Sequence, residues 1–474
     1  MMKERHVEVA ILGAGTAGLS AYSEVRKVTD NFVLINSGSE GTTCARVGCM
    51  PSKVLIQVAN DFHRRHVFTQ EGIYGGEHLH VDHSKVLQYV RSLRDAFVQG
   101  VMKSLDEIGD RIIHGHAHFR EPTVIEVEQQ VICAKRVVIA TGSTPVLPLE
   151  WRSFTDHILT TDTLFEQLEL PSSLVVVGLG AVGVEMGQAL ARLGVRITGI
   201  TQRDQLAGLT DPQVNSYLRT VLAQEFPIHT GAAAQLQAIG TQLNVHFADT
   251  TLRAEKILAS LGRSPNITKL GLAQLGLPLN EHGLPPHDPT TMQVADLPVF
   301  IAGDADGARA VLHEAADEGR IAGFNSVQEH PHCFQRRTPL AIVFCEPNAA
   351  IVGQAFTTLH DQDIAIGEVR FDNQGRAKVM AEQKGILRVY GDKSNGRLLG
   401  AELAAPHGEH LAHLLAWAIQ KEMTVFDMLQ LPFYHPVVEE GMRTALRHLS
   451  QQVSVHRPSF ELAMCESAAV VTLD

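Results

Sequence analysis

The sequence lacks an excess of positive charge. It carries 40 Lys and Arg residues against 52 Asp and Glu residues, for a formal net charge of -12 at pH 7. It also contains no basic stretch with interleaved aromatic residues. Nucleic acids are polyanions, so this acidic balance disfavours nonspecific contact with them. We therefore expect small molecules or proteins as partners, and no nucleic acid.

Long apolar runs are missing as well. No apolar stretch reaches the length of about 18 residues that a membrane-spanning helix needs, and residues 1–9 lack the apolar core of a secretory signal. The proportions of hydrophobic residues (45%) and charged residues (19%) are those of a soluble globular protein. The sequence predicts no membrane span, and the cytoplasm is the expected location.

Cysteine is scarce, with 6 residues in 474. A chain of this length without a secretory signal is not expected to rest on a disulfide framework. Cys44 and Cys49 nevertheless lie close together in the stretch TTCARVGCMPSK, residues 42–53. We interpret the remaining, widely separated cysteines as buried or incidental thiols: Cys133, Cys333, Cys345 and Cys465.

The chain opens with a βαβ pattern. Residues 7–12 are rich in β-forming residues, a glycine-rich turn and a helical pattern follow, and residues 32–35 form a second apolar run. Gly13, Gly15 and Gly18 have the GxGxxG spacing that permits a tight turn, close approach of a pyrophosphate and close helix packing. A second copy carries Gly178, Gly180 and Gly183 between β-forming runs. The repeat predicts two dinucleotide sites.

Both copies depart from the fingerprint at the same place. An acidic residue about 20 residues further on usually accepts a hydrogen bond from the adenosine ribose. Asn36 stands there in the first copy and Thr201 in the second, with Arg203 two residues later. Because Thr201 carries no charge to repel a 2′-phosphate, the second site favours NADP or a relaxed choice of nucleotide. Arg203 as a solvated turn residue is the alternative.

The close cysteine pair has three possible roles: metal ligands, a structural disulfide or a redox-active dithiol. Zinc sites usually combine two short Cys or His pairs, and no second pair accompanies Cys44 and Cys49. In a regular helix, residues i and i+5 lie about 7.5 Å apart along the axis, so a bond between these cysteines requires a distorted first helical turn, to which Gly48 can contribute. A strained bond that closes a small loop suits redox turnover better than stabilisation.

Landmarks along nearly the whole chain resemble those of the flavoprotein disulfide reductases, which include dihydrolipoamide dehydrogenase, glutathione reductase and mercuric reductase. They are the two GxGxxG units, the cysteine stretch, VVIATGSTP at 137–145, ILASLGRSPN at 257–266, VFIAGDADG at 299–307, GILRVYGDKSNGRLLGAEL at 385–403 and HPVVEE at 435–440. The resemblance implies FAD in the first site, NAD or NADP in the second, and a redox-active Cys44–Cys49 disulfide.

The resemblance also assigns roles to individual residues. Cys49 is expected beside the flavin and Cys44 is expected to exchange with the substrate, while His435 and Glu440 form the acid-base pair. Pro436 reads as a first helical residue, with Glu440 in the first turn, and Glu439 competes with Glu440 for the carboxylate role. Lys53 and Glu185 correspond to a pair that the family places near the flavin nitrogen that takes hydride.

Other residues of these motifs are expected to bind the cofactors, and Asp304 would hold the flavin ribityl chain. The full predicted set comprises Gly13, Gly15, Gly18, Asn36, Thr43, Lys53, Gly115, Ala140, Thr141, Gly142, Gly178, Gly180, Gly183, Thr201, Arg203, Gly262, Arg263 and Asp304. We expect no metal. His114, His116 and His118 alternate along one β-like face, but the family has an ordinary strand there, around Gly115.

The order of motifs predicts an α/β protein with two Rossmann-like dinucleotide-binding domains and a C-terminal α+β dimerisation domain. The expected segments are an FAD-binding domain at 1–148, an NAD(P)-binding domain at 149–268, a return to the FAD-binding domain at 269–337, and an interface domain at 338–474. The resemblance implies a homodimer in which the histidine of one subunit completes the cysteine site of the other.

The leading hypothesis for function is a dihydrolipoamide dehydrogenase-like enzyme acting on a small-molecule or lipoyl-domain dithiol or disulfide. Ser52 and Ala181 stand where glutathione reductases carry lysine and tyrosine, and the lone Cys465 argues against mercuric reductase, which needs a second cysteine pair near the C-terminus. The alternative is an NADPH-dependent reductase of another disulfide, a quinone or a metal ion. Thr42, in place of a glycine, and Arg46, in place of an asparagine, are departures close to the cysteine pair.

Overall fold

The structure is a computed structural model that describes residues 3–239, 242–455 and 460–463. The described residues fall into two compact units. The first lies within Met1–Val58, Val81–Pro171 and Lys256–Arg336, and the second within Ala59–His80, Ser172–Glu255 and Arg337–Asp474. Cys465 lies outside the described residues. No helix in the described part of the chain is long and apolar enough to cross a membrane.

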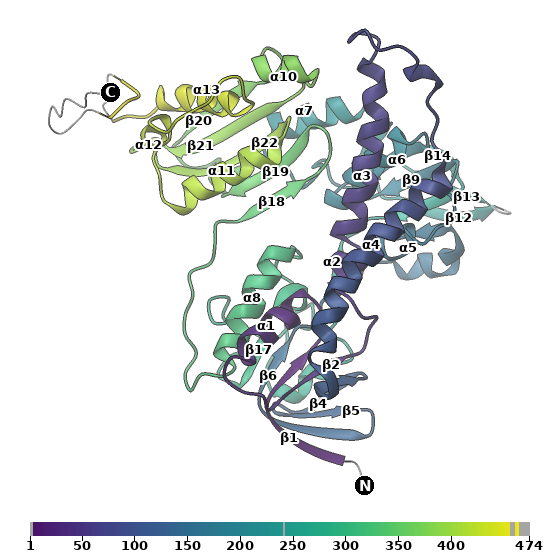
Figure 1. Cartoon of the computed structure of the whole chain (residues 1–474), viewed down its shortest axis with the longest axis vertical. Coiled ribbons are helices and arrows are strands. Elements are labelled where there is room, and N and C mark those ends of the chain that lie inside the picture. The colour runs from purple at the N-terminus through teal and green to yellow at the C-terminus, as the bar shows by residue number, and fades with distance from the viewer. Residues whose placement is uncertain (1–2, 240–241, 456–459, 464–474) are drawn as a thin grey trace, which may run out of the picture. The chain divides into compact units, whose positions relative to one another are not determined.

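A mixed sheet forms the centre of the first unit (Figure 1). Its parallel strands are β3 (Ile112–His114), β2 (Phe32–Asn36), β1 (Lys3–Leu12), β6 (Gln130–Ile139) and β17 (Val299–Ile301). The antiparallel strands β5 (Val124–Val127) and β4 (Ala117–Glu121) follow β6. Parallel strands joined through helices are typical of a dinucleotide-binding sheet, so this sheet agrees with the predicted first Rossmann-like domain.

Two helices pack together beside that sheet in the first unit: α1 (Thr16–Val25) and α8 (Leu312–Asn325). Small residues along α1, among them Ala17 and Ala21, are buried with Ala315 and Ala322 of α8. β7 (Ser143–Pro145) pairs antiparallel with β16 (Arg263–Pro265), and β8 (Ile158–Leu159) pairs parallel with β15 (Lys256–Ala259). The sequence motifs at 137–145 and 257–266 are therefore brought side by side.

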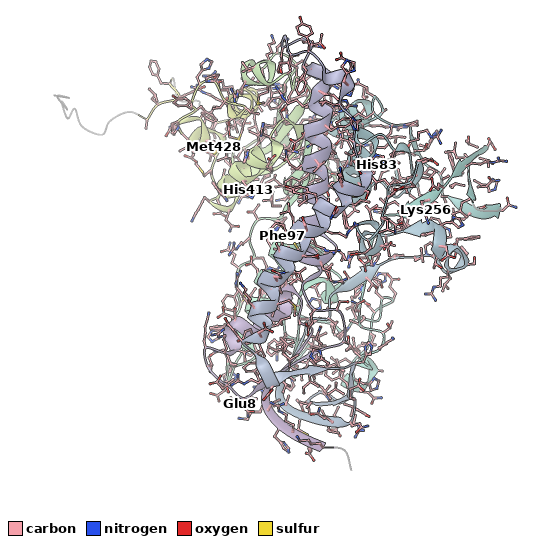
Figure 2. The ribbon with its side chains drawn as sticks, turned by 45° about the vertical axis from the view of Figure 1, so that its right-hand side comes forward. Glu8, His83, Phe97, Lys256, His413 and Met428 are labelled. Atoms are coloured by element: carbon pink, nitrogen blue, oxygen red, sulfur yellow. The ribbon has the colours of Figure 1, made fainter. Side chains whose placement is uncertain are left out.

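Helices α2 (Thr43–Arg46), α3 (Cys49–His63) and α4 (His83–Asp106) follow the first βαβ unit. Asp82 caps the long helix α4, because its side chain accepts a hydrogen bond from the Lys85 backbone N–H at 3.1 Å. His83 and Phe97 mark the course of α4 in Figure 2. The first compact unit also contains the shorter segments η3 (Gly109–Arg111), η4 (Leu149–His157), α5 (Thr161–Leu164), η5 (Leu272–Leu275) and η6 (Gly303–Asp306).

The second unit contains the second dinucleotide-binding pattern of the chain. Its parallel strands are β9 (Ser173–Val177), β10 (Arg196–Thr201) and β11 (Ile228–Thr230). Helix α6 (Ala181–Arg192) connects β9 to β10, and α7 (Pro212–Leu222) precedes β11. An antiparallel sheet follows, made of β12 (Gln235–Ile239), β13 (Gln242–Phe247) and β14 (Thr250–Ala254). The βαβ order of β9, α6 and β10 is the one predicted from the second GxGxxG motif.

A five-stranded antiparallel sheet forms the C-terminal part of the second unit. Its order is β18 (Leu340–Val343), β19 (Asn348–Gly353), β22 (Leu398–Ala405), β21 (Ile386–Asp392) and β20 (Ile364–Arg370). Helix α11 (Gly408–Gln420) packs on β19 and β22, and α13 (Glu439–Ser450) packs on β20 and β21. His413 on α11 and Met428 on α12 (Val425–Leu429) are labelled in Figure 2. This arrangement confirms the predicted α+β fold.

Shorter helices complete the second unit: η1 (Arg64–Val67), η2 (Gly76–His78), α9 (Phe356–Leu359) and α10 (Gly375–Met380). Two predictions about local structure were wrong. Helix α13 begins at Glu439 and not at Pro436, although Glu440 does lie in its first turn. His114 and His118 do not share one strand, because His114 ends β3 and β4 begins at Ala117. Gly115, with φ +151°, lies at the break between them.

Candidate active site

Cys44 and Cys49 lie on two successive helices instead of one continuous helix. Cys44 belongs to α2 and Cys49 is the first residue of α3, with the break at Val47 and Gly48. Both side chains are half-buried thiols. A hydrogen bond with Cys49, together with burial, raises the pKa of Cys44, while Lys53 acts in the opposite direction. The break therefore lets the two sulfur atoms approach, which a regular helix with this spacing does not allow.

The two unusual neighbours of the pair have different environments. Thr42 is the N-cap of α2, and its side-chain oxygen accepts a hydrogen bond from the Ala45 N–H at 3.2 Å. The Arg46 Nε is buried and has no hydrogen-bond partner among the residues that the structure describes. The presence of Thr42 is thus explained by its role as a helix cap. The Nε–H donor of Arg46, in contrast, is not satisfied by the described protein atoms. Thr43, a predicted cofactor ligand, is exposed.

The first glycine-rich turn has the shape of a phosphate cradle. A Cβ atom at Gly13 would lie 2.2 Å from the Ala140 carbonyl oxygen, and one at Gly18 would lie 1.8 Å from the Gly13 carbonyl oxygen. Only glycine permits such close packing of β1, α1 and β6. A Cβ at Gly15, by contrast, would meet no atom within 4 Å. The N-terminus of α1 therefore faces open space, as binding of a pyrophosphate requires.

Further predicted FAD ligands gather around this turn. Asn36 ends β2, and its side-chain oxygen accepts a hydrogen bond from the Ala14 N–H at 3.4 Å. The Gly115 N–H donates to the Asn36 carbonyl oxygen at 3.0 Å. Thr141, which follows β6, has a buried side-chain oxygen without a hydrogen-bond partner among the described residues. An orphaned hydroxyl beside a phosphate cradle fits a bound dinucleotide, because buried polar groups are normally satisfied.

Asp304 and Arg263, far apart in sequence, meet through Ser143. The Ser143 hydroxyl donates to the Asp304 carboxylate at 2.5 Å, and the Arg263 Nε donates to the Ser143 hydroxyl oxygen at 2.7 Å. Arg263 and Asp304 also form an ion pair at 3.8 Å. Gly142 and Gly262 lie in the two loops that carry these contacts, on either side of the β7–β16 pairing. Three separate sequence motifs thus converge on one polar cluster in the first unit.

The sequence patterns did not reveal a group of buried acidic residues next to the Asp304 loop. Glu318 of α8 accepts a hydrogen bond from the Gly303 N–H at 2.8 Å and pairs with Arg336 at 2.6 Å. Burial raises the pKa values of Glu318 and Asp306, and the nearby Asp306 carboxylate further raises that of Glu318. These residues hold the Asp304 loop in place. Their separation in sequence left no local pattern by which they could have been found.

The second glycine-rich turn has the same form as the first. Gly178 has φ +93°, Gly183 is buried in α6, and a Cβ at Gly180 would meet no atom within 4 Å. Thr201 ends β10 and is buried, and Arg203 follows on the surface. In the described part of the chain Arg203 forms no ion pair. The turn therefore fits a second dinucleotide, with a free cation near the end of β10.

Glu185 and the predicted acid-base residues belong to the second unit. Glu185 of α6 is buried, and its carboxylate accepts a hydrogen bond from the Phe344 N–H at 2.9 Å. The His435 Nδ1 lies 3.0 and 3.1 Å from the two carboxylate oxygens of Glu440. This contact with His435 lowers the pKa of Glu440. The structure thus pairs Glu440, and not Glu439, with the histidine.

Family models match most of the chain. The model for pyridine nucleotide-disulphide oxidoreductase matches residues 7–319, and that for the dimerisation domain of this family matches residues 340–446. A dihydrolipoyl dehydrogenase from Geobacillus stearothermophilus is 27% identical over 445 residues, which cover 91% of this chain and 94% of that protein. A mercuric reductase from Shigella flexneri is 28% identical over 466 residues, with coverage of 94% and 81%.

Solved structures share the fold. LpdA from Mycobacterium tuberculosis superposes with a TM-score of 0.82 at 23% identity, covering 94% of this chain and 99% of that one. The Cu(II) complex of the HOCl-induced flavoprotein disulfide reductase RclA from Escherichia coli gives a TM-score of 0.82 at 21% identity, covering 95% and 100%. With two family models over both parts of the sequence, the chain belongs to the pyridine nucleotide-disulphide oxidoreductases, a family that binds FAD and NAD(P).

Proposed function

We propose that the protein is a dihydrolipoyl dehydrogenase-like enzyme. It transfers two electrons between a nicotinamide dinucleotide and a dithiol or disulfide substrate, by way of FAD and the Cys44–Cys49 pair. The observation that carries the proposal is the hydrogen-bonded contact of these two half-buried thiols at a helix break in the first unit. A dithiol that can close and open without refolding the chain suits turnover.

The residues around the first glycine-rich turn fit FAD. Gly13, Gly15 and Gly18 would receive its pyrophosphate, Thr141 would donate to it, and Asp304 would accept from its ribityl chain. When bound, FAD would supply a centre that exchanges an electron pair with the nicotinamide, as hydride, on one side and with the cysteine pair on the other. Lys53 on α3 adds a positive charge to the cysteine region. Glu185 is proposed to act together with Lys53 near the flavin nitrogen that takes hydride.

Cys44 is the proposed exchanging thiol. A thiolate of the substrate attacks the Cys44 sulfur, the bond to Cys49 breaks, and Cys49 leaves as a thiolate with the electron pair. The second substrate thiolate then attacks the substrate sulfur of the mixed disulfide, so the substrate disulfide forms and Cys44 leaves as a thiolate. Two protons leave the substrate, and two electrons stay on the cysteine pair.

His435 is the proposed base for those protons, and Glu440 orients its ring through Nδ1. This leaves Nε2 as the atom that takes and returns a thiol proton. We further propose that the active form is a homodimer in which His435 of one subunit serves the cysteine pair of the other, as the match to the dimerisation domain supports. An active monomer in light scattering would contradict the shared site.

A second candidate is an NADPH-dependent reductase of another disulfide, a quinone or a metal ion in the cytoplasm. Uncharged Thr201 favours NADPH in this candidate, as does exposed Arg203, which has no ion-pair partner among the residues that the structure describes. The mercuric reductase among the relatives and the Cu(II) complex of RclA support a metal-ion substrate as one form of it. The small-molecule or lipoyl-domain substrate of the first candidate is supported by the dihydrolipoyl dehydrogenase relative.

The mechanism is tested by Cys44→Ser. This variant should lose disulfide and dithiol turnover while keeping the yellow flavin, because the exchanging sulfur is gone but the cofactor site is unchanged. Cys333→Ser is the matched control, since Cys333 is an exposed thiol of the same unit and should leave turnover as in the natural protein. Unchanged turnover in Cys44→Ser would exclude the proposed exchange step.

The two candidates are separated by anaerobic reduction with NADH and with NADPH, followed by rates with dihydrolipoamide, glutathione disulfide and a quinone. Arg203→Ala should slow reduction by NADPH by about 10-fold or more, because a hydrogen bond to a charged group contributes about 1.5–3 kcal/mol. Arg196→Ala, at the opposite end of β10, is the control. Far faster reduction by NADH than by NADPH would remove the second candidate.

A further inference from the structure

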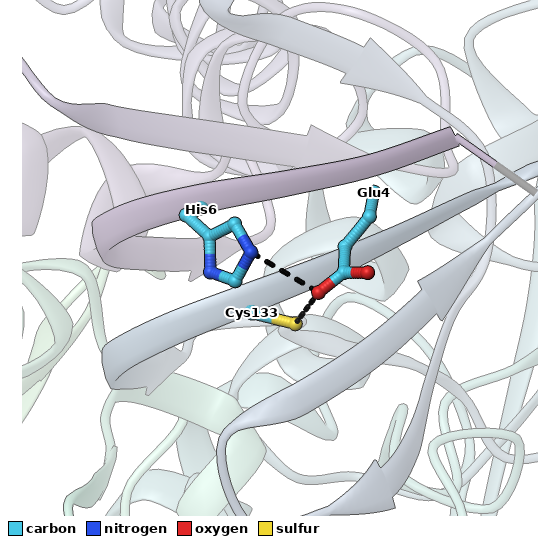
Figure 3. Close-up of side chains that lie close together, drawn as sticks. All are labelled: Glu4, His6 and Cys133. Atoms are coloured by element: carbon cyan, nitrogen blue, oxygen red, sulfur yellow. Dashed lines mark hydrogen bonds and ion pairs between the residues drawn. The ribbon is translucent and has the colours of Figure 1, made fainter.

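A group of three potential metal ligands lies on the surface of the first unit, apart from the cysteine pair. Glu4 and His6 come from β1, and Cys133 comes from β6. One ligand atom from each side chain lies within 4.8 Å of the other two. Figure 3 shows the three side chains turned toward one another across the two strands.

The register of the strands builds this group. β1 and β6 pair in parallel with His6 opposite Cys133. Residues i and i+2 of a strand share one face, so Glu4 projects on the same side as His6. Three ligands held by two central strands of a sheet have little freedom to separate, which favours a defined site over a chance contact on a loop.

The distances suit a tetrahedral ion. The Glu4 Oε1 lies 3.1 Å from the His6 Nε2 and 3.4 Å from the Cys133 Sγ (Figure 3). Bonds of about 2.0–2.3 Å to zinc place neighbouring ligand atoms about 3.3–3.7 Å apart in a tetrahedron. Shifts of a few tenths of an ångström would therefore admit an ion, which would replace the thiol proton of Cys133.

The surrounding charges favour a cation. Glu8 lies two residues beyond His6 on the same face of β1 and pairs with the Lys135 ammonium at 3.0 Å, so this nearby cation is already compensated. Glu121 adds negative charge near Cys133. The side chains of Glu4 and His6 are 59% and 75% exposed, which leaves a coordination position open to water.

We propose that Glu4, His6 and Cys133 form a surface site for one divalent transition-metal ion of the zinc class. A thiolate, an imidazole and a carboxylate are the ligand types that zinc and cobalt accept together. Magnesium and calcium require several oxygen ligands and are not expected here. The bound ion would join β1 to β6 at the sheet that carries the first glycine-rich turn.

A second group of possible ligands, His407, Glu409 and His410, makes a weaker site. It offers no thiolate, and it lies at the N-terminus of α11, where the helix dipole disfavours a cation. The imidazole rings of His407 and His410 are stacked, with centroids 5.9 Å apart. This second group serves as an internal control for the proposal.

The test uses the full-length flavoprotein with the Cys44–Cys49 pair oxidised, so that this pair offers no thiolate. Co²⁺ is added to metal-free protein, and its absorption is followed at wavelengths beyond the flavin bands. Equilibrium dialysis with Zn²⁺ gives the stoichiometry. We expect one ion per chain, and a rise in the unfolding temperature on binding because only the folded state holds all three ligands.

The variants identify the ligands. Cys133→Ser and His6→Gln should each weaken binding of Co²⁺ and Zn²⁺ at least 10-fold, while keeping the flavin spectrum of folded protein. Cys333→Ser and the double variant His407→Gln/His410→Gln should bind as the natural protein does. The proposal is overturned if the natural protein binds neither ion, if Cys133→Ser and His6→Gln bind as well as it does, or if only the double variant loses binding.

Discussion

Replacement of Glu440 by glutamine tests how the histidine is oriented. Glu440 contacts one atom of the ring, Nδ1, through both carboxylate oxygens, at 3.0 and 3.1 Å. Glutamine keeps the size of the side chain and removes its charge. The variant should therefore weaken the orientation of the ring without disturbing helix α13, where Glu440 occupies the first turn.

The size of the effect follows from exposure. The side chain of His435 is 78% exposed, so solvent screens the contact and we use the range for an ordinary hydrogen bond, about 0.5–1.5 kcal/mol. This corresponds to about a two- to tenfold lower kcat. Loss of the base itself in His435→Gln should cost about 100-fold or more. Glu439→Gln, on the same helical turn, should change kcat little.

Steady-state oxidation of dihydrolipoamide, compared with the rate of flavin reduction by NAD(P)H, is the assay. The rate of dihydrolipoamide oxidation should fall, and the rate of flavin reduction should stay the same, because reduction by the nucleotide does not need the proton that His435 transfers. Since Glu440 acts through His435, adding Glu440→Gln to His435→Gln should cost nothing further. Additive losses in the double variant, or equal losses in Glu439→Gln and Glu440→Gln, would refute this division of roles.

The contact also has a defined pH range. His435 lowers the pKa of Glu440 below its ordinary value of 4.5. A carboxylate with a lowered pKa in the folded state contributes stability above its ordinary pKa and loses it as the pH falls through the lowered value. We therefore expect the ring to stay oriented throughout the neutral range.

Three further predictions concern stability, measured by denaturant unfolding or by melting. Arg192→Met should lower the free energy of unfolding by about 3–5 kcal/mol, because Arg192 is only 4% exposed and pairs with Glu225 at 2.7 Å; exposed Arg196→Met is the control. Asp306→Asn should raise the melting temperature more at pH 8 than at pH 5, because the pKa of Asp306 is raised by burial and its ionised form is disfavoured as the pH rises; a larger gain at pH 5 would contradict this. Thr42→Ala should cost about 1 kcal/mol by removing the cap of α2, and Thr42→Ser should restore most of it.

Much of the fold could be predicted because it depends on patterns of residues that are close together in the sequence. Glycines at fixed spacing between β-forming runs indicated both dinucleotide turns, and the structure has β1, α1 and β2 and then β9, α6 and β10 in the expected order. The spacing of Cys44 and Cys49 indicated a distorted helix, and the break between α2 and α3 lies between them. The start of α13 was misplaced, because Pro436 is compatible with a helix start but does not require one.

The sequence by itself determined the family, the two nucleotide-binding turns and the cysteine pair, since each depends on residues only a few positions apart. Tertiary structure alone decided that Glu318 supports the Asp304 loop, that Arg263 reaches Asp304 through Ser143, and that Cys133 lies opposite His6. These contacts depend on the register of strands and on helix packing. A shift of one residue in the pairing of β1 and β6 would turn His6 away from Cys133, and no local pattern records that register.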